Sequence, residues 1–216
     1  MCEQTSILFD MDGVILDSMS WHVRAWQEAL GDHGYSVPAE TIYMHEGAIE
    51  PDTAVAIFSS QSTSIEEAEF QRILERQIEI FSVRYRDRVS PFPEAVDLVI
   101  RLHRAGKRMA IVTSSYWDIL DGVLPKEIRN CMDHIVTGDQ VARRKPHPDP
   151  YLAALSGLEE RPDRCVVVEN APAGIAAAKA AALQCVALTT TLSEEHLAGA
   201  DAVLDSHGEL VSYLLG

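Results

Sequence analysis

The chain has 216 residues, enough for one large domain or for one domain that carries an insertion. Its 47% of hydrophobic and 24% of charged residues are typical of a globular protein. The formal net charge of −15 argues against nucleic acid or an anionic membrane surface as a partner. A small anionic substrate stays compatible with this charge, because a metal ion and a few cationic side chains can dominate a cleft.

The sequence also carries no pattern for export or membrane insertion. No apolar run approaches the roughly 18 residues that a membrane-spanning helix needs. The start, Met1-Cys2-Glu3-Gln4, has no basic residue and precedes only a short apolar stretch, so we expect no signal peptide. The 4 cysteines are widely spaced without a Cys-x-x-Cys pair, which favours reduced thiols and a cytoplasmic location.

The first predicted strand, Ser6–Phe9, leads directly into Asp10-Met11-Asp12-Gly13. Because glycine permits a sharp turn, Asp10 and Asp12 are predicted at the carboxyl end of a central strand, where open α/β sheets bind ligands. Two carboxylates this close repel each other unless a cation lies between them. The pair therefore indicates a divalent metal site with one aspartate free for chemistry.

The next segment, as far as about residue 90, contains no predicted strand. Ser20–Leu30 and Ser64–Tyr85 have apolar residues at helical spacing, and Ser90-Pro91-Phe92-Pro93 is typical of a hinge. We predict a helical cap formed by residues 17–90, inserted into a catalytic core formed by residues 1–16 and 91–216. An insertion at this point would cover the active site as a lid, although a purely structural subdomain is an alternative.

The rest of the chain alternates short apolar runs with helical patterns. This alternation predicts an α/β fold with a doubly wound parallel sheet. After Ser6–Phe9, the predicted strands are Arg108–Val112, His134–Val136, Cys165–Val168, Cys185–Leu188 and Ala202–Leu204, and the predicted helices include Glu94–Ala105 and Pro172–Leu183.

Three further candidate functional motifs follow predicted strands. Thr113-Ser114-Ser115 offers hydroxyls and backbone N–H groups that suit a phosphate oxygen. Lys145 supplies a cation, and Glu169-Asn170 supplies more oxygen atoms. Each pattern has an ordinary explanation by itself, such as a turn, a helix cap or a solvated surface run. Their occurrence together at successive strand ends favours a single site.

These motifs resemble those of the haloacid dehalogenase-like superfamily, in the branch with a helical cap after the first motif. That branch includes beta-phosphoglucomutase-like proteins and sugar-phosphate phosphatases. The resemblance covers nearly the whole chain. The four matching segments are Asp10–Ser18, Thr113-Ser114-Ser115, Lys145-Pro146 and Glu169–Ile175.

The resemblance implies a role for each motif residue. Asp10 would attack phosphorus to give an aspartyl-phosphate, and Asp12 would be the general acid and then the general base. Mg²⁺ would bridge Asp10 and the phosphoryl group, also bound by the Asp12 backbone carbonyl, while Lys145 would pair with nucleophile and phosphate. The implied phosphate-binding residues are Gly13, Thr113, Ser114 and Lys145, and the implied metal-binding residues are Asp10, Asp12, Glu169 and Asn170.

The fourth motif departs from the common pattern, because relatives usually have Glu-Asp where this chain has Glu169-Asn170. An amide oxygen can bind Mg²⁺ but contributes no charge. Either Glu169 supplies the third metal-binding carboxylate, or the metal is held less tightly. We expect catalysis to survive the change.

Two reactions of the superfamily are disfavoured by the sequence. Halide displacement does not use a second aspartate at the position of Asp12. Phosphonate cleavage needs a cap lysine, and the predicted cap has none, since the lysines are Lys107, Lys126, Lys145 and Lys179.

A phosphosugar mutase is the main alternative, and His22 with Ala25-Trp26 resembles the start of a mutase cap. Mutases bind a second phosphate with cap cations in a Lys-Gly-x-x-Arg pattern. The corresponding stretch here is Glu46-Gly47-Ala48-Ile49-Glu50, whose two carboxylates would repel a second phosphate. The sequence therefore favours a phosphatase that acts on a small phosphorylated metabolite, such as a sugar or polyol monophosphate.

A phospho-receiver or binding module is the non-enzyme alternative, since receiver domains also combine acidic residues, Ser or Thr and Lys around Mg²⁺. They are shorter, carry no such cap and accept the phosphoryl group at a later strand. Substrate specificity is expected near Trp21, His22, Glu46 and Glu50, whereas Arg72 and Arg76 fit solvated helix faces. The oligomeric state stays open.

Overall fold

The computed structural model describes residues 5–45 and 65–216. Within these residues, six strands form one parallel sheet in the order β5-β4-β1-β6-β7-β8, which confirms the predicted α/β fold. The chain leaves β1 toward one edge of the sheet and later returns to its other side, so a topological switch point lies beside β1. The strands are β1 (Ser6–Phe9), β4 (Arg108–Val112), β5 (His134–Val136), β6 (Cys165–Glu169), β7 (Gln184–Leu188) and β8 (Ala202–Leu204).

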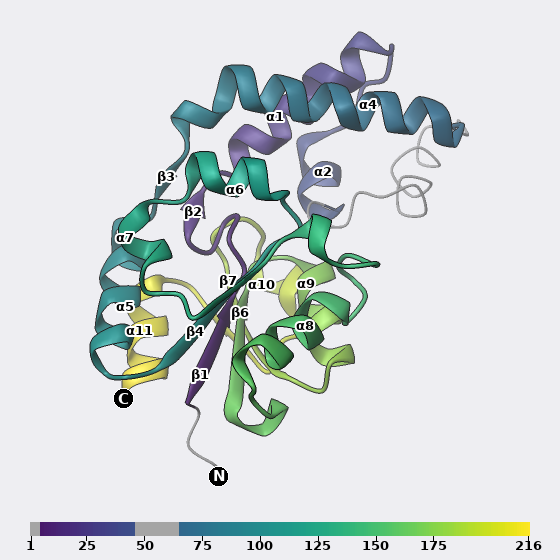
Figure 1. The fold of residues 1–216 in the computed structure, drawn as a ribbon. Coiled ribbons are helices and arrows are strands. Elements are labelled where there is room, and N and C mark those ends of the chain that lie inside the picture. The colour runs from purple at the N-terminus through teal and green to yellow at the C-terminus, as the bar shows by residue number, and fades with distance from the viewer. Residues whose placement is uncertain (1–4, 46–64) are drawn as a thin grey trace.

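Helices cover both faces of this sheet. Figure 1 shows α5 (Pro93–Arg104) and α11 (His207–Leu215) on one face, with α8 (Asp149–Leu158) and α9 (Pro172–Ala180) on the other. Shorter helices complete the connections: α6 (Trp117–Val123), α7 (Lys126–Arg129) and α10 (Glu194–Leu197), with single helical turns at Gly138–Gln140 and Pro162–Arg164.

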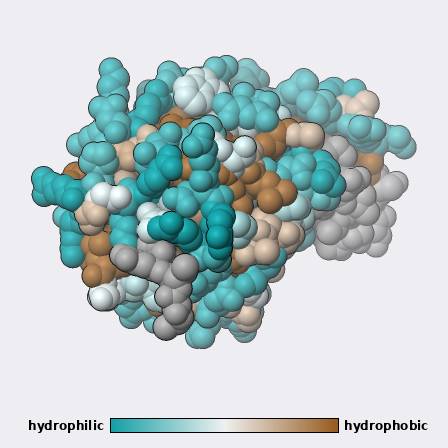
Figure 2. Space-filling view, turned by 60° about the horizontal axis from the view of Figure 1, so that its bottom comes forward, coloured by the Kyte–Doolittle hydropathy of each residue, from teal (hydrophilic) through white to brown (hydrophobic). Residues whose placement is uncertain are grey.

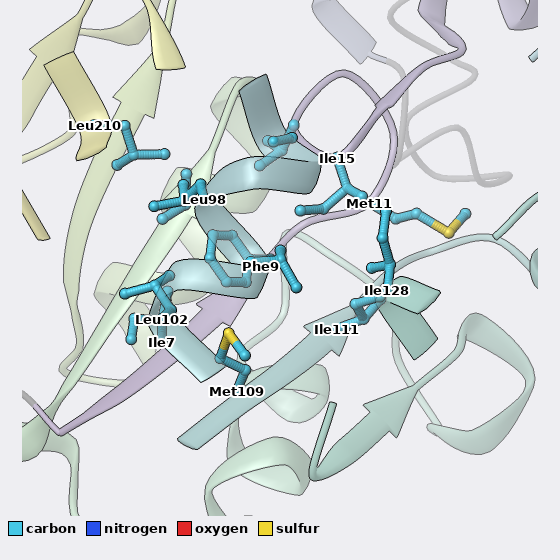
Figure 3. Packing of buried hydrophobic residues seen from close by; sticks show 14 of the residues in the cluster. Ile7, Phe9, Met11, Ile15, Leu98, Leu102, Met109, Ile111, Ile128 and Leu210 are labelled. Carbon is cyan, nitrogen blue, oxygen red and sulfur yellow. The ribbon is translucent and has the colours of Figure 1, made fainter. Parts of the chain in front are cut away.

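Alternate residues of each strand enter two separate hydrophobic clusters. Ile7 and Phe9 pack toward Leu98 on α5 and Leu210 on α11, as Figure 3 shows. Leu8, which points the other way, joins the cluster that contains residues of α8 and α9. Burying each such side chain contributes about 1.5–3 kcal/mol, so the central strand is held from both sides.

A group of helices separates β1 from the rest of the sheet in sequence and lies beyond the carboxyl ends of the strands (Figure 1). We call residues 19–45 and 65–88 the helical region. It has its own hydrophobic cluster, with Val23 and Trp26 packed among Phe70 and Ile73. Its elements are α1 (Met19–Asp32), α2 (Ala39–His45), α4 (Glu67–Ile80), the π-helical turn η1 (Phe81–Tyr85) and the 3₁₀ turn η2 (Arg86–Arg88).

The chain passes between the sheet and the helical region at a short ladder that the sequence did not predict. Here β2 (Leu16–Asp17) pairs antiparallel with β3 (Ser90–Pro91). Strands of two residues have no hydrophobic period, so alternation cannot detect them. The predicted hinge around Ser90–Pro93 thus forms one side of this ladder.

The borders of the predicted elements differ little from those observed. The helix predicted at Ser64–Tyr85 is α-helical only over Glu67–Ile80 and widens to a π-helical turn, while Ser64 lies outside the described residues. The helix predicted at Pro172–Leu183 ends at Ala180.

The thiols of Cys131, Cys165 and Cys185 are free, and Cys2 lies outside the described residues.

The surface shown in Figure 2 is mainly hydrophilic, with smaller hydrophobic areas between the polar side chains. Among the residues that the structure describes, no helix combines the length and the apolar character needed to cross a membrane.

Candidate active site

The two aspartates lie on a tight loop at the end of β1. The Asp10 amide donates to the carbonyl oxygen of Val168 at 2.9 Å, which ties the start of the loop to the neighbouring strand β6. Met11 is fully buried in the hydrophobic cluster of Figure 3, so the residue between the aspartates anchors the loop. Gly13 then turns the chain with a φ of +82°, a conformation that residues with a Cβ avoid.

Lys145 joins three strand ends through its ammonium group. Its Nζ donates to Asp10 Oδ1 at 2.6 Å, to the Val112 carbonyl oxygen at 2.9 Å and to Glu169 Oε1 at 2.7 Å. Burial by itself would lower the pKa of Lys145, but the carboxylates of Asp10 and Glu169 raise it above its ordinary value. All three donors of a charged lysine are therefore used inside the site.

Glu169 is fully engaged by protein groups. Its Oε1 accepts from Lys145 and also from the Tyr151 hydroxyl at 2.7 Å, while its Oε2 accepts from the Asn170 backbone N–H at 3.0 Å. Burial first, and then the charge of Glu169, raises the pKa of Tyr151 well above its ordinary value, so this hydroxyl stays a donor. In this arrangement Glu169 holds Lys145 in place beside Asp10.

Asp12 is surrounded by hydrogen-bond donors from both the sheet and the helical region. Ser18 Oγ donates to Oδ1 at 2.6 Å, Ser115 Oγ donates to Oδ2 at 2.9 Å, and His22 Nε2 lies 3.3 Å from Oδ1. Burial would raise the pKa of Asp12, but His22 and the hydrogen bonds from His22, Ser18 and Ser115 together lower it. His22 is itself fixed by stacking on Phe81, with ring centroids 3.9 Å apart.

The hydroxyls of the second motif have different positions. Thr113 is buried and bonds within the site, since its Oγ1 lies 3.4 Å from Asp12 Oδ2 and accepts from the Ser115 N–H at 3.0 Å. Ser114 and Ser115 instead line the cleft beside Asp10 and Asp12. Thr113 and Gly13 are not among the described residues that line this cleft, so their predicted contact with phosphate stays a prediction.

Some residues around Asp12 were not among the predicted site residues. Ser115 belongs to the second motif and Ser18 ends the first, so their place in the motifs is a signal that was available. His22 was expected near the substrate, and it lines the cleft, but it also packs on Phe81 and contacts Asp12. Phe81, on which His22 stacks, begins a π-helical turn, which no sequence pattern shows.

Comparison with known proteins agrees with this arrangement. A family model described as haloacid dehalogenase-like hydrolase matches residues 5–182. The chain belongs to this hydrolase family. It is 33% identical to fructose-1-phosphate phosphatase YqaB of Escherichia coli, covering 83% of the chain and 94% of that relative. It is also 31% identical to hexitol phosphatase A of the same organism, covering 92% of the chain and 89% of the relative.

Solved structures place the haloacid dehalogenase-like chain in the beta-phosphoglucomutase-like branch. A putative beta-phosphoglucomutase from Bacteroides vulgatus superposes with a TM-score of 0.82 at 27% identity, covering 97% of this chain and 87% of that one. The family and its phosphatase relatives make the chain a phosphoric monoester hydrolase.

The residues of this hydrolase site fit a hard divalent cation such as Mg²⁺. The carboxylates of Asp10, Asp12 and Glu169 lie together with one buried ammonium group, and this excess of negative charge favours a further cation. Burial first, with Glu169 and Asp12 adding to it and Lys145 opposing it, raises the pKa of Asp10 to about 8. Oxygen donors are available on Asp10 and on the Asn170 amide, which both line the cleft.

The residues available to bind a cation are not all carboxylates. Within the described part of the chain, no three His, Cys, Asp or Glu side chains are grouped as a metal site. Glu169 already accepts hydrogen bonds on both oxygens, whereas the carbonyl oxygen of the Asn170 side chain accepts none within these residues. Asn170 is therefore the better-placed donor of the fourth motif.

The wall of the cleft opposite the strand ends comes from the helical region and is mostly apolar. Its residues are Met19, His22, Trp26, Leu74, Gln77, Ile78 and Phe81. Gln77 is only 5% exposed, and its amide makes no hydrogen bond within the described residues. Arg76 points elsewhere, to Asp32 and Glu79, and Arg72 is exposed and not part of this wall. The stretch Glu46–Glu50 lies outside the described residues.

Proposed function

We propose that this hydrolase is a Mg²⁺-dependent phosphatase that cleaves a sugar or polyol monophosphate through an aspartyl-phosphate. The observation that carries the proposal is the buried triad at the strand ends, where Lys145 Nζ lies 2.6 Å from Asp10 Oδ1 and 2.7 Å from Glu169 Oε1. A carboxylate fixed by one oxygen can present the other to a substrate phosphorus. The substrate class rests on the named relatives, which act on fructose 1-phosphate and hexitol phosphates.

In the first half of the reaction, Asp10 attacks phosphorus and the bond to the leaving alcohol breaks. Asp12, whose surroundings lower its pKa, must first take up a proton, and it then gives that proton to the alcohol oxygen, so the alcohol leaves neutral. Asp10, Asp12 through its backbone carbonyl, and Asn170 would hold Mg²⁺. When bound, the cation neutralises phosphoryl charge and aligns the attack. Lys145 offsets the repulsion between the nucleophile and the phosphate.

In the second half, water replaces the alcohol and the same groups act in reverse. Asp12 takes a proton from water as the water attacks the phosphoryl group, and the Asp10–phosphorus bond breaks to release inorganic phosphate. Ser18, Ser115 and His22 surround the Asp12 carboxylate and would keep it oriented through both proton transfers. Ser114, which lines the cleft, is the proposed contact for phosphoryl oxygens.

The helical region acts in this proposal as a cap that covers the substrate. The division is the one expected from the sequence, with residues 17–90 as cap and residues 1–16 and 91–216 as core. The β2–β3 ladder, where both crossings lie side by side, is the natural place for cap movement. Closure would bring the apolar wall and Gln77 onto the leaving group and exclude bulk water from the phosphoryl group.

The wall also supports a monophosphate over a bisphosphate. Its described residues include no lysine or arginine, whereas a mutase must hold a second phosphate there. A short carbon chain with hydroxyl groups suits an apolar surface that offers one amide.

A screen of phosphorylated metabolites tests the proposal. Hexose phosphates, hexitol phosphates, glycerol phosphates and phosphoglycolate are incubated with the purified chain and Mg²⁺, with and without excess EDTA. We expect release of inorganic phosphate that EDTA abolishes. Isomerised sugar phosphate from beta-glucose 1-phosphate with a bisphosphate primer would instead establish a mutase, and no turnover of any compound would favour a binding module.

A further inference from the structure

Two consecutive threonines after β7 bind the two loops that carry the proposed cation ligands. Thr190 Oγ1 donates to the Gly13 carbonyl oxygen at 2.6 Å. Thr191 Oγ1 accepts from Asn170 Nδ2 at 2.8 Å. Neither threonine lies in a motif of the sequence analysis, and neither is among the described residues that line the cleft.

The nitrogen end of the Asn170 side chain occupies a niche that these loops build. A Cβ added to Gly13 would lie 2.0 Å from Asn170 Nδ2 and 2.9 Å from Thr191 Oγ1, so the niche exists because residue 13 is glycine. Asn170 is only 1% exposed, which leaves its amide little freedom to rotate. With Nδ2 bound to Thr191, the carbonyl oxygen is the end left without a hydrogen bond among the described residues.

The orientation of an amide matters more than the orientation of a carboxylate. A carboxylate presents an oxygen whichever way it turns, whereas a turned amide presents N–H groups, which repel a cation. Because this chain has an amide at residue 170, its site needs something that selects the oxygen. The Thr191 hydroxyl, as an acceptor for Nδ2, provides that selection.

We propose that Thr191 is a positioning residue that turns the Asn170 amide oxygen toward the cation site and so sets the affinity for Mg²⁺. The inference rests on the proposed function in one respect, namely that this site takes a divalent cation. This explains how the site tolerates an uncharged ligand. An amide that is already held in the binding orientation loses less conformational entropy when the cation binds than an amide that must first reorient.

Isothermal titration of the full chain with MgCl₂, without substrate, tests this directly. Thr191→Val removes the hydroxyl at nearly constant volume, and we expect Mg²⁺ affinity to fall about 10-fold, the usual cost of losing a group that orients a metal ligand. Thr191→Ser keeps the hydroxyl and should bind as the parent does. Thr189→Val is the matched control, because the Thr189 hydroxyl contacts Asp205 outside the site.

The same substitution in an Asn170→Asp background separates positioning from general loop damage. Since either oxygen of the introduced carboxylate can face the cation, Thr191→Val should now change the affinity far less than it does beside asparagine. An equal loss in both backgrounds, or no loss in either, would overturn the inference while leaving the proposed phosphatase intact. If the parent chain binds no Mg²⁺ at all, the cation dependence of the proposed function fails and the inference fails with it.

Discussion

The two walls of the cleft differ in how far their polar groups are satisfied within the protein. On the core wall, Lys145 uses all three donors and Glu169 accepts on both oxygens. On the wall from the helical region, Gln77 is buried among apolar side chains and its amide has no partner within the described residues. The Gln77 amide is not among the described buried atoms that lack a partner, so it is open to the cleft.

This difference assigns the two walls different tasks. A closed network of charges fixes its side chains in one geometry. Phosphoryl transfer needs such a geometry, because the reacting group is the same in every phosphoester. An apolar wall that offers one amide to the cleft can distinguish leaving groups by shape and by a single hydrogen bond. The comparison predicts that changes on the core wall remove activity, and that changes on the other wall redistribute it among substrates.

The largest effect is expected from Asp10→Asn on the core wall. An amide is not a nucleophile toward phosphorus, so phosphate release should fall by at least about 1,000-fold at saturating substrate. The side chain keeps its size, so circular dichroism and the unfolding midpoint should stay close to those of the parent. Activity near the parental level would show that another group attacks phosphorus.

Lys145→Met should reduce both the rate and the stability. It leaves the buried carboxylates of Asp10 and Glu169 without their ammonium partner, so we expect the free energy of unfolding to fall by about 3 kcal/mol. Turnover should fall by about 100-fold or more, since a preorganised charge at the phosphate is lost. Urea unfolding and steady-state kinetics measure the two effects.

Lys179→Met is the matched control for that change. Lys179 also forms a carboxylate pair, 2.7 Å from Asp201, but its side chain is 42% exposed and lies outside the cleft. Exposed pairs contribute at most about 1 kcal/mol, and the rate should not change. If both lysine variants lose the same stability, the core wall is not the closed network described above.

A smaller effect is expected from Gln77→Met on the helical wall. The substitution keeps the volume and removes the amide, so kcat/KM for hydroxylated substrates should fall about 10-fold, the value of one hydrogen bond. For a simple alkyl phosphate, which has no hydroxyl to bind, kcat/KM should stay unchanged. Stability should stay close to that of the parent, because the amide lines the cleft and makes no hydrogen bond within the described residues. A loss of stability would instead mean that the amide serves the fold.

The sequence predicted the sheet well for a physical reason. Its four central strands are buried along nearly their whole length and are therefore contiguous apolar runs, which can be recognised without an alignment. The motifs at their ends were predicted to meet because parallel strands bring their carboxyl ends to one edge, and Asp10, Lys145 and Glu169 do lie together. Their chemical roles stay predictions.

What the sequence did not predict depends on contacts between distant segments. The β2–β3 ladder forms because residues 16–17 and 90–91 meet, and neither pair has a pattern of its own. The different positions of Glu169 and Asn170 also depend on distant segments, since Glu169 is occupied by hydrogen bonds from Tyr151 and Lys145. Gln77 could have been recognised from the sequence, because it stands at a helical spacing from Phe70 and Leu74, where an apolar residue is expected.

The smallest effect is expected from a change outside both walls. Ala182 follows α9 with a φ of +57°, a left-handed conformation that costs alanine more than glycine. Ala182→Gly should therefore raise the free energy of unfolding by about 0.5–1 kcal/mol while leaving kcat and KM unchanged. Gly106→Ala is the reverse test, because Gly106 has a φ of +72° and an added Cβ would meet no atom within 4 Å. It should destabilise the protein through its backbone alone. If either variant altered substrate preference, recognition would extend beyond the cleft, and the contrast between its two walls would not account for specificity.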